Sequence, residues 1–199
     1  MRNKFIAILT MLVLNLNPID LVAADEFIFE VTNIEVVENG TVYKGSNRGK
    51  ITTNSLTEIE SNNFKYLKKT NQLEANGDVI LTDIQNDIII NAEKIFYLKN
   101  EEKIYTLGKT LIKISDKYNI EGYDITLLKN EMILSSNKKT IITDSFSNVY
   151  KLDKFEYSIN QEILKGEKIE ITTNYKKSKS DKYFFETGFI NLKENKFLA

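Results

Sequence analysis

The chain has 199 residues, of which 42% are hydrophobic and 28% are charged, and its formal net charge is −1. This composition predicts a folded chain and excludes the disordered and low-complexity classes. The chain contains no histidine and no cysteine. It therefore lacks the commonest general base, the thiol nucleophile, the best metal ligands and any disulfide bond, and its charge argues against a nucleic-acid partner.

The N-terminal segment, residues 1–24, has the pattern of a cleavable secretory signal peptide. Basic first residues precede an apolar run over 5–16, and the small residues Val22-Ala23-Ala24 follow as a cleavage site. The apolar run is shorter than the roughly 20 residues that a membrane-spanning helix needs. We therefore expect export, with a mature chain that begins at Asp25.

A repeat of about thirty residues organises the rest of the chain, which is expected to form one domain over 25–199. Residues 25–58 are an atypical first segment, and units start near residues 59, 90, 120, 150 and 184. In each of five copies an apolar residue returns nine positions after the start of the best-matched segment. Those segments start at Phe64, Ile95, Ile125, Phe155 and Phe189.

Each unit is expected to be a β-hairpin, because its apolar stretches are short and rich in β-branched residues, as in Asp87-Ile-Ile-Ile-Asn91. Asn100, Asn130 and Asn160 share one repeat position, where asparagine suits a turn and tolerates left-handed backbone. Gly77 and Gly108 share another position and indicate a bend. The fold class predicted is all-β, built from stacked antiparallel strands.

Columns of apolar residues at fixed register predict that successive units cover one another. One column lies five residues before the first residue of each best-matched segment. Another column lies sixteen residues after the first residue of each of the first four segments. The second column is Ile80, Leu111, Ile141 and Ile171. The last copy stops at Ala199, before the strand that should follow it, so we expect an unpaired edge that could join another chain.

The sequence predicts no catalytic, cofactor or metal site. Acidic pairs such as Glu101-Glu102 fall at a turn, where solvated carboxylates keep ordinary pKa values, and no phosphate loop, nucleophile elbow or calcium loop occurs. The remaining candidate is the apolar ladder, which forms either a closed core or a groove for acyl chains. Lys99 and Lys129 are expected to face outward. The candidate lining residues are Ile88, Ile90, Ile95, Tyr97, Ile104, Leu111, Ile125, Leu127, Phe155 and Tyr157.

A signal peptide followed by such units resembles the OstA-like repeats of the lipopolysaccharide-transport family. The best match runs from Asn91-Ala-Glu-Lys-Ile95-Phe-Tyr97 to Ile104-Tyr-Thr-Leu-Gly108, within a good match over 59–115 and a looser one over 116–199. Within that family the chain is most similar to the N-terminal periplasmic domain of LptD, with LptA second. It has no counterpart of the LptD barrel or of the LptD cysteines.

The resemblance implies an open β-jelly roll that carries the acyl chains of lipid A in an apolar groove, in the periplasm and associated with the outer membrane. It also implies lipopolysaccharide as ligand, end-to-end joining to other jelly-roll subunits of the LptA, LptC and LptD type, and delivery to an outer-membrane barrel. Two alternatives stay open. One is a structural β-solenoid of the adhesin type with a closed core, and the other is a polysaccharide-processing β-helix enzyme.

Overall fold

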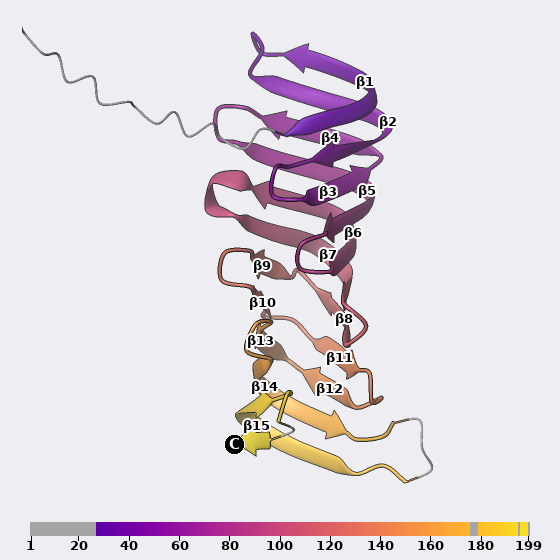
Figure 1. The fold of residues 1–199 in the computed structure, drawn as a ribbon, viewed down its shortest axis with the longest axis vertical. Coiled ribbons are helices and arrows are strands. Elements are labelled where there is room, and N and C mark those ends of the chain that lie inside the picture. Colours follow the sequence, from indigo (N-terminus) through magenta and orange to yellow (C-terminus); the bar gives the residue numbers. More distant parts are fainter. Residues whose placement is uncertain (1–26, 176–178, 195, 199) are drawn as a thin grey trace, which may run out of the picture.

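The structure, a computed structural model, describes residues 27–175, 179–194 and 196–198. The predicted signal peptide lies outside these residues. The described chain is one antiparallel sheet rolled about a long axis, with β1 near one end and β16 near the other (Figure 1). Its strands are β1 Ile28–Val37, β2 Val42–Thr52, β3 Thr57–Ser61, β4 Asn63–Leu67, β5 Gln72–Asp83, β6 Ile88–Leu98, β7 Lys103–Ile114, β8 Tyr118–Tyr123, β9 Thr126–Leu128, β10 Ile133–Ser136, β11 Thr140–Asp144, β12 Val149–Leu152, β13 Lys154–Ser158, β14 Ile163–Thr172, β15 Lys182–Asn191 and β16 Lys196–Leu198.

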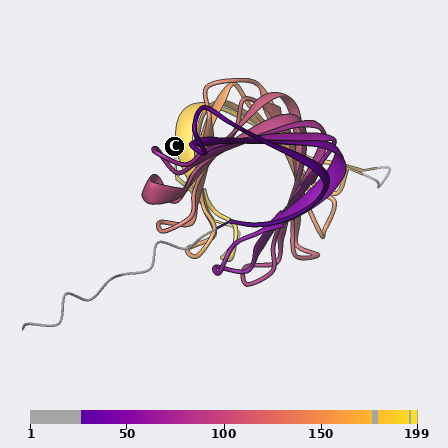
Figure 2. The ribbon, with the colours of Figure 1, turned by 90° about the horizontal axis from the view of Figure 1, so that it is seen from above.

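The predicted all-β fold of stacked antiparallel strands, an open jelly roll, is confirmed. Within the described residues the helical content is one 3-10 turn, Lys99–Glu101. Sequential strands pair as neighbours, as β5, β6 and β7 do along their whole lengths. Viewed along the long axis, the strands curve around the centre of the molecule (Figure 2). The roll is open in the sense that its two sides meet through turns and not through strand pairing.

Each long strand turns a corner near its middle, and the predicted bend glycines lie at these corners. Gly77 and Gly108 have φ of +83° and +81°, a left-handed backbone that glycine adopts without steric cost. The pairing of β5 with β6, and of β6 with β7, shifts register at these points, as in a β-bulge. Next to β7, the corner falls at the interruption between β8 and β9. The Gly108 N–H donates to the carboxylate of Asp124 at this interruption (2.8 Å). The corners therefore stack on one another.

Side chains alternate between a dry interior and the outer face. Along β7, Ile104, Thr106, Thr110 and Ile112 are buried, whereas residues between them are exposed. This alternation confirms the predicted inner columns at the first four starts and nine residues later, because both positions fall on the inward phase. These residues are Phe64, Ile95, Ile125, Phe155, Leu73, Ile104, Leu134 and Leu164.

The column sixteen residues after each start does not behave as one interior row. Ile80, Leu111 and Ile141 are exposed on the outer face, at 36%, 45% and 40%, and only Ile171 is buried. Each exposed member lies between two buried neighbours, as Ile80 does between Val79 and Leu81. An apolar residue can occupy either face of a strand, so hydrophobicity alone did not assign its side.

The alignment of the fifth copy was wrong by one residue. Leu164 pairs with Ile190 and Gly166 with Gly188, so Ile190 faces inward and is buried. Phe189, predicted to start this copy on the inner face, is 48% exposed. A slip of one residue moves every side chain of a strand to the opposite face.

The turns at the ends of the strands form two rows that run along the molecule. The first turn row comprises residues 38–41, 68–71, 99–102, 129–132 and 159–162, and the second comprises 53–56, 84–87, 115–117 and 145–148. Backbone hydrogen bonds join consecutive turns of a row, such as Lys129 N–H to Glu102 C=O (2.9 Å) and Ser115 N–H to Asp87 C=O (2.8 Å). Such bonds join all the turns of the first row and the first three turns of the second, and the fourth turn of the second row follows the third through the pairing of β8 with β11.

The predicted turns at Asn100, Asn130 and Asn160 are confirmed, but the left-handed backbone lies two residues later. Glu102, Met132 and Glu162 have φ of 46°, 54° and 54°. In the preceding turn the corresponding residue is Asn71, with φ of 52°. The left-handed position thus carries different residue types, and its carbonyl accepts the bond from the next turn.

Truncation of an interior residue should cost much more stability than truncation of an outer one. Leu134 is 0% exposed, so we expect Leu134→Ala to lower the free energy of unfolding by about 2–5 kcal/mol. Leu111→Ala is the matched control on the outer face, with an expected change within about 0.5 kcal/mol. Urea denaturation followed by circular dichroism measures both, and equal losses would contradict this assignment of faces.

Candidate functional site

The interior of the roll brings together all but one of the candidate lining residues. Its walls come from strands on both sides of the corners, since Ile88 and Ile90 precede the corner of β6 and Ile95 and Tyr97 follow it. Nearly all of the candidates are exposed by 2% or less. They are Ile88, Ile90, Ile95, Tyr97, Ile104, Ile125, Leu127, Phe155 and Tyr157.

Leu111 does not join the interior. It is 45% exposed and lies between the buried Thr110 and Ile112 on β7. Its place on the candidate list came from the column of apolar residues that the strand in fact presents to solvent. Ile112 and Ile114 are the inward residues of this strand and were missed, although the period of two counted from Ile104 would have found Ile112.

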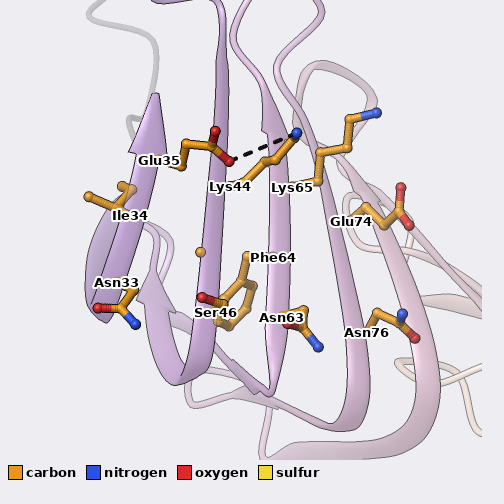
Figure 3. Close-up of a pocket in the computed structure, with 11 residues that line it drawn as sticks. Asn33, Ile34, Glu35, Lys44, Ser46, Asn63, Phe64, Lys65, Glu74 and Asn76 are labelled. Atoms are coloured by element: carbon orange, nitrogen blue, oxygen red, sulfur yellow. Dashed lines mark ion pairs between the residues drawn. The ribbon is translucent and has the colours of Figure 1, made fainter. Parts of the chain in front are cut away.

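Apart from Leu111, the candidate lining residues belong to one cluster of buried apolar side chains. The hollows of the described surface include one of about 860 Å³ between β10, β13, β14, β15 and β16, which Phe155 also lines, and a depression of about 400 Å³ over β1, β2, β4 and β5 (Figure 3). There Glu35 and Lys44 form an ion pair of 4.0 Å.

The two turn rows meet along one side of the roll, which we name the mouth. A polar depression at the mouth is lined from the second row by Ser55 and Asn86 and from the first row by Glu102, Lys129 and Asn130. Side chains, rather than backbone pairing, close the roll along this line. The mouth is therefore the part of the wall that can open without breaking a strand ladder.

A buried ion pair crosses the mouth. The Lys129 Nζ lies 3.2 Å from Asp83 Oδ2, and the two side chains are 7% and 1% exposed. The same ammonium group donates to the Thr57 hydroxyl. Asp83 ends β5 and Thr57 begins β3, both beside the second turn row, whereas Lys129 belongs to the first. The sequence prediction that Lys129 faces outward is wrong.

Beside this pair, a tyrosine of the interior reaches the polar groups of the mouth. The Tyr97 hydroxyl donates to Glu102 (2.6 Å), which also pairs with the Lys99 ammonium group. Burial, helped by the negative charge of Glu102, raises the pKa of Tyr97 well above its usual value. Lys99 is 6% exposed, so its predicted outward position is also wrong. Lys99 is held by Glu102 of its own turn, whereas Lys129 is held by Asp83 at the end of β5, and no local sequence pattern indicates this distant partner.

A second link crosses the mouth further along the roll. Glu162, in the first turn row, accepts hydrogen bonds from the Lys117 ammonium group (2.6 Å) and the Tyr118 hydroxyl (3.0 Å) beside the second. Lys117 lowers the pKa of Glu162 below its usual value, and Tyr118 adds to the effect. This link is more exposed than the first, because the Lys117 side chain is 61% accessible.

Aromatic side chains gather at both ends of the interior. At the β1 end, the Phe27 ring lies 5.1 Å from that of Tyr66 and 5.7 Å from that of Tyr97, edge to face. At the other end, the Phe197 ring stacks on Tyr183 (6.1 Å) and Phe185 (6.3 Å). Phe27 is buried, so it covers Tyr97 at the end of the roll.

The described residues offer no group of three or more acidic, histidine or cysteine side chains that could hold a metal ion. Within the same residues no helix is long and apolar enough to cross a membrane. The chemistry of the described site is therefore that of an apolar interior with lysine, carboxylate and tyrosine groups along its mouth.

The Glu162 link should make stability depend on pH. A carboxyl whose folded pKa is lowered stabilises the fold above its unfolded pKa, and this contribution is lost as pH falls through the folded value. We expect Glu162→Gln to lower the free energy of unfolding by about 1 kcal/mol at pH 7 and by progressively less as the pH falls below the unfolded pKa towards 3. Urea denaturation at both pH values checks this.

Glu121→Gln is the control for this experiment. Glu121 pairs with Lys109 on the outer face (2.7 Å), where both side chains are about half exposed. Its replacement should change stability little at either pH, because exposed ion pairs contribute little. An equal loss for Glu162→Gln at pH 7 and pH 3 would show that the carboxylate does not carry the link.

No protein-family model matches the chain, and no curated protein matches it. Among solved structures, the chain is similar to LptH from Pseudomonas aeruginosa, described as the LptA-homologous periplasmic component of the conserved lipopolysaccharide transport device. The two share 12% sequence identity with a TM-score of 0.49, and the match covers 55% of this chain and 80% of that one.

Proposed function

We propose that this chain is a non-enzymatic periplasmic domain that binds the acyl chains of lipid A in its interior and passes lipopolysaccharide towards the outer membrane. The observation that carries the proposal is an apolar interior that continues through the repeat and is closed along one side only by side chains. The resemblance of residues 91–108 to the lipopolysaccharide-transport repeats supports the same ligand.

The repeat is well suited to an elongated apolar ligand. Each unit adds inward side chains to the same columns, so the interior keeps its apolar character over the length of the roll. An acyl chain that leaves water for such surroundings gains about 0.8 kcal/mol per buried methylene. The gain is almost independent of position along the roll, and a ligand could therefore move along it.

The edges of the roll suit end-to-end joining to like subunits. Among the described strands β1 pairs only with β2, and β15 pairs with β16 only over Phe189–Asn191. An unpaired strand edge is a template for a strand of another chain. We propose partners of the LptA, LptC and LptD type and an outer-membrane barrel. For the chain itself, we propose the N-terminal domain of LptD as the first choice and LptA as the second.

One observation favours a second candidate function, that of a structural β-solenoid. The candidate lining residues in the interior are exposed by 2% or less, which is the closed core that such a protein requires. The two candidates differ in one property. A structural solenoid has no saturable uptake of lipid, whereas a lipid conduit binds acyl chains against the inward side chains.

Photo-crosslinking from neighbouring positions separates the two candidates. A small diazirine-bearing aliphatic residue replaces Leu127, which is 1% exposed in the interior, and in turn Leu128, its neighbour on the opposite face of β9. We expect lipopolysaccharide to label from position 127 at least tenfold more strongly than from position 128. Equal labelling, or none at either position, would contradict the lipid conduit.

Edge pairing should appear as concentration-dependent association, measured by sedimentation equilibrium. Glu35 and Val36 are adjacent on β1, and neighbouring N–H groups of a strand point to opposite sides. Of the variants Glu35→Pro and Val36→Pro, one therefore removes a donor at the free edge and the other a bond to β2. We expect the variant that removes the donor at the free edge to weaken association without loss of thermal stability. Association unaffected by either variant would exclude β1 as the joining edge.

A further inference from the structure

The ion pair between Lys129 and Asp83 lies directly above the interior. The Lys129 Nζ is 5.9 Å from the centre of the Tyr97 ring, and Tyr97 is 0% exposed. Lys99 approaches the same ring at 5.6 Å. Two ammonium groups therefore lie over the aromatic ring of Tyr97 at the mouth.

A buried ion pair is a bond that the protein can exchange at modest net cost. The attraction between Lys129 and Asp83 is largely offset by the water that both groups lost on burial. When the turn rows separate, water returns to both charges and restores that loss. A pair of apolar side chains would regain nothing in the same step, so this pair suits a contact that opens and closes.

The contacts along a turn row differ in kind from the contacts across the mouth. Backbone hydrogen bonds join the turns of the first row and the first three turns of the second, whereas the described links across the mouth are made by side chains, such as Lys129 with Asp83 and Lys117 with Glu162. A row that swings outward keeps its own ladder and breaks only these side-chain links. The links are spaced along the mouth, so they control its opening together.

We propose that the Lys129–Asp83 pair is a gate through which the acyl chains of a phosphorylated lipid enter the roll from the side, between the two turn rows. This inference rests on the proposed function. When the gate opens, Lys129 and Lys99 exchange carboxylate partners for the lipid phosphates, while the acyl chains reach Tyr97 below. The ammonium groups thus select an anionic headgroup at the place where the apolar interior becomes accessible.

A reversible cross-link across the mouth tests the gate. Ser55 and Asn130 line the polar depression from opposite rows, and the chain has no cysteine of its own, so Ser55→Cys with Asn130→Cys gives the only two thiols. A bifunctional thiol reagent with a reducible link locks the mouth while Lys129 and Asp83 stay in place. We expect uptake of fluorescent lipopolysaccharide to slow at least tenfold and to recover on reduction.

The control carries the same cross-link on the outer face. Lys65 and Glu74 are register partners on β4 and β5, so Lys65→Cys with Glu74→Cys joins neighbouring strands and does not link the two turn rows. The control should take up lipid at the wild-type rate. Uptake that is equal in locked and unlocked protein would overturn the gate but leave the proposed function standing, whereas no uptake by the wild type would overturn both.

Asp83→Asn tests the charge of the gate in a chain without a cross-link. It keeps the size of the side chain and removes the negative partner of Lys129, and circular dichroism confirms that the variant is folded at the temperature used. We expect its uptake of lipopolysaccharide to be at least threefold faster than that of the wild type. Unchanged or slower uptake by the folded variant would show that the ion pair does not hold the mouth.

Discussion

Backbone hydrogen bonding between consecutive strands is the interaction on which the whole structure depends. The chain has no disulfide bond, and each unit is too small to bury its apolar residues alone. The pairing must also continue around the corners, which is why glycines with left-handed backbone and strand breaks occur there in step. Once the corners are aligned, the inward side chains of neighbouring units come into contact and the interior becomes dry.

The same constraint leaves the mouth, within the described residues, without backbone hydrogen bonds from one turn row to the other. Strands end there in turns, and backbone groups of the turns bond along the rows rather than across them. The gap between rows is closed by lysine, carboxylate and tyrosine groups, whose contacts are easier to exchange than a strand pair. Because the strands end in turns at the mouth, the paired strands form rigid walls, whereas the mouth is closed by side-chain contacts that can be exchanged.

The sequence predicted what repeats locally and missed what depends on partners far along the chain. The inner columns through Ile95 and Ile104 were predictable, because strand alternation and the repeat length fix their phase. Leu111 was misplaced because the outer face is also apolar at that position. Phe189 was misplaced because aligning the fifth copy one residue too early still puts an apolar residue at its start. Lys129 binds Thr57, a partner 72 residues away, which no local pattern reveals.

The laddered turn rows have a consequence for how such a molecule can change its length. The bond from each turn to the next has the same form in successive units, as from Lys99 to Asn71 and from Lys129 to Glu102. Each unit therefore presents the same surface to its neighbour above and below. A duplicated unit could be inserted without redesign of the others, and each insertion of two strands would lengthen the roll by about 10 Å. The number of repeats thus sets the distance that the protein spans, in steps of one hairpin.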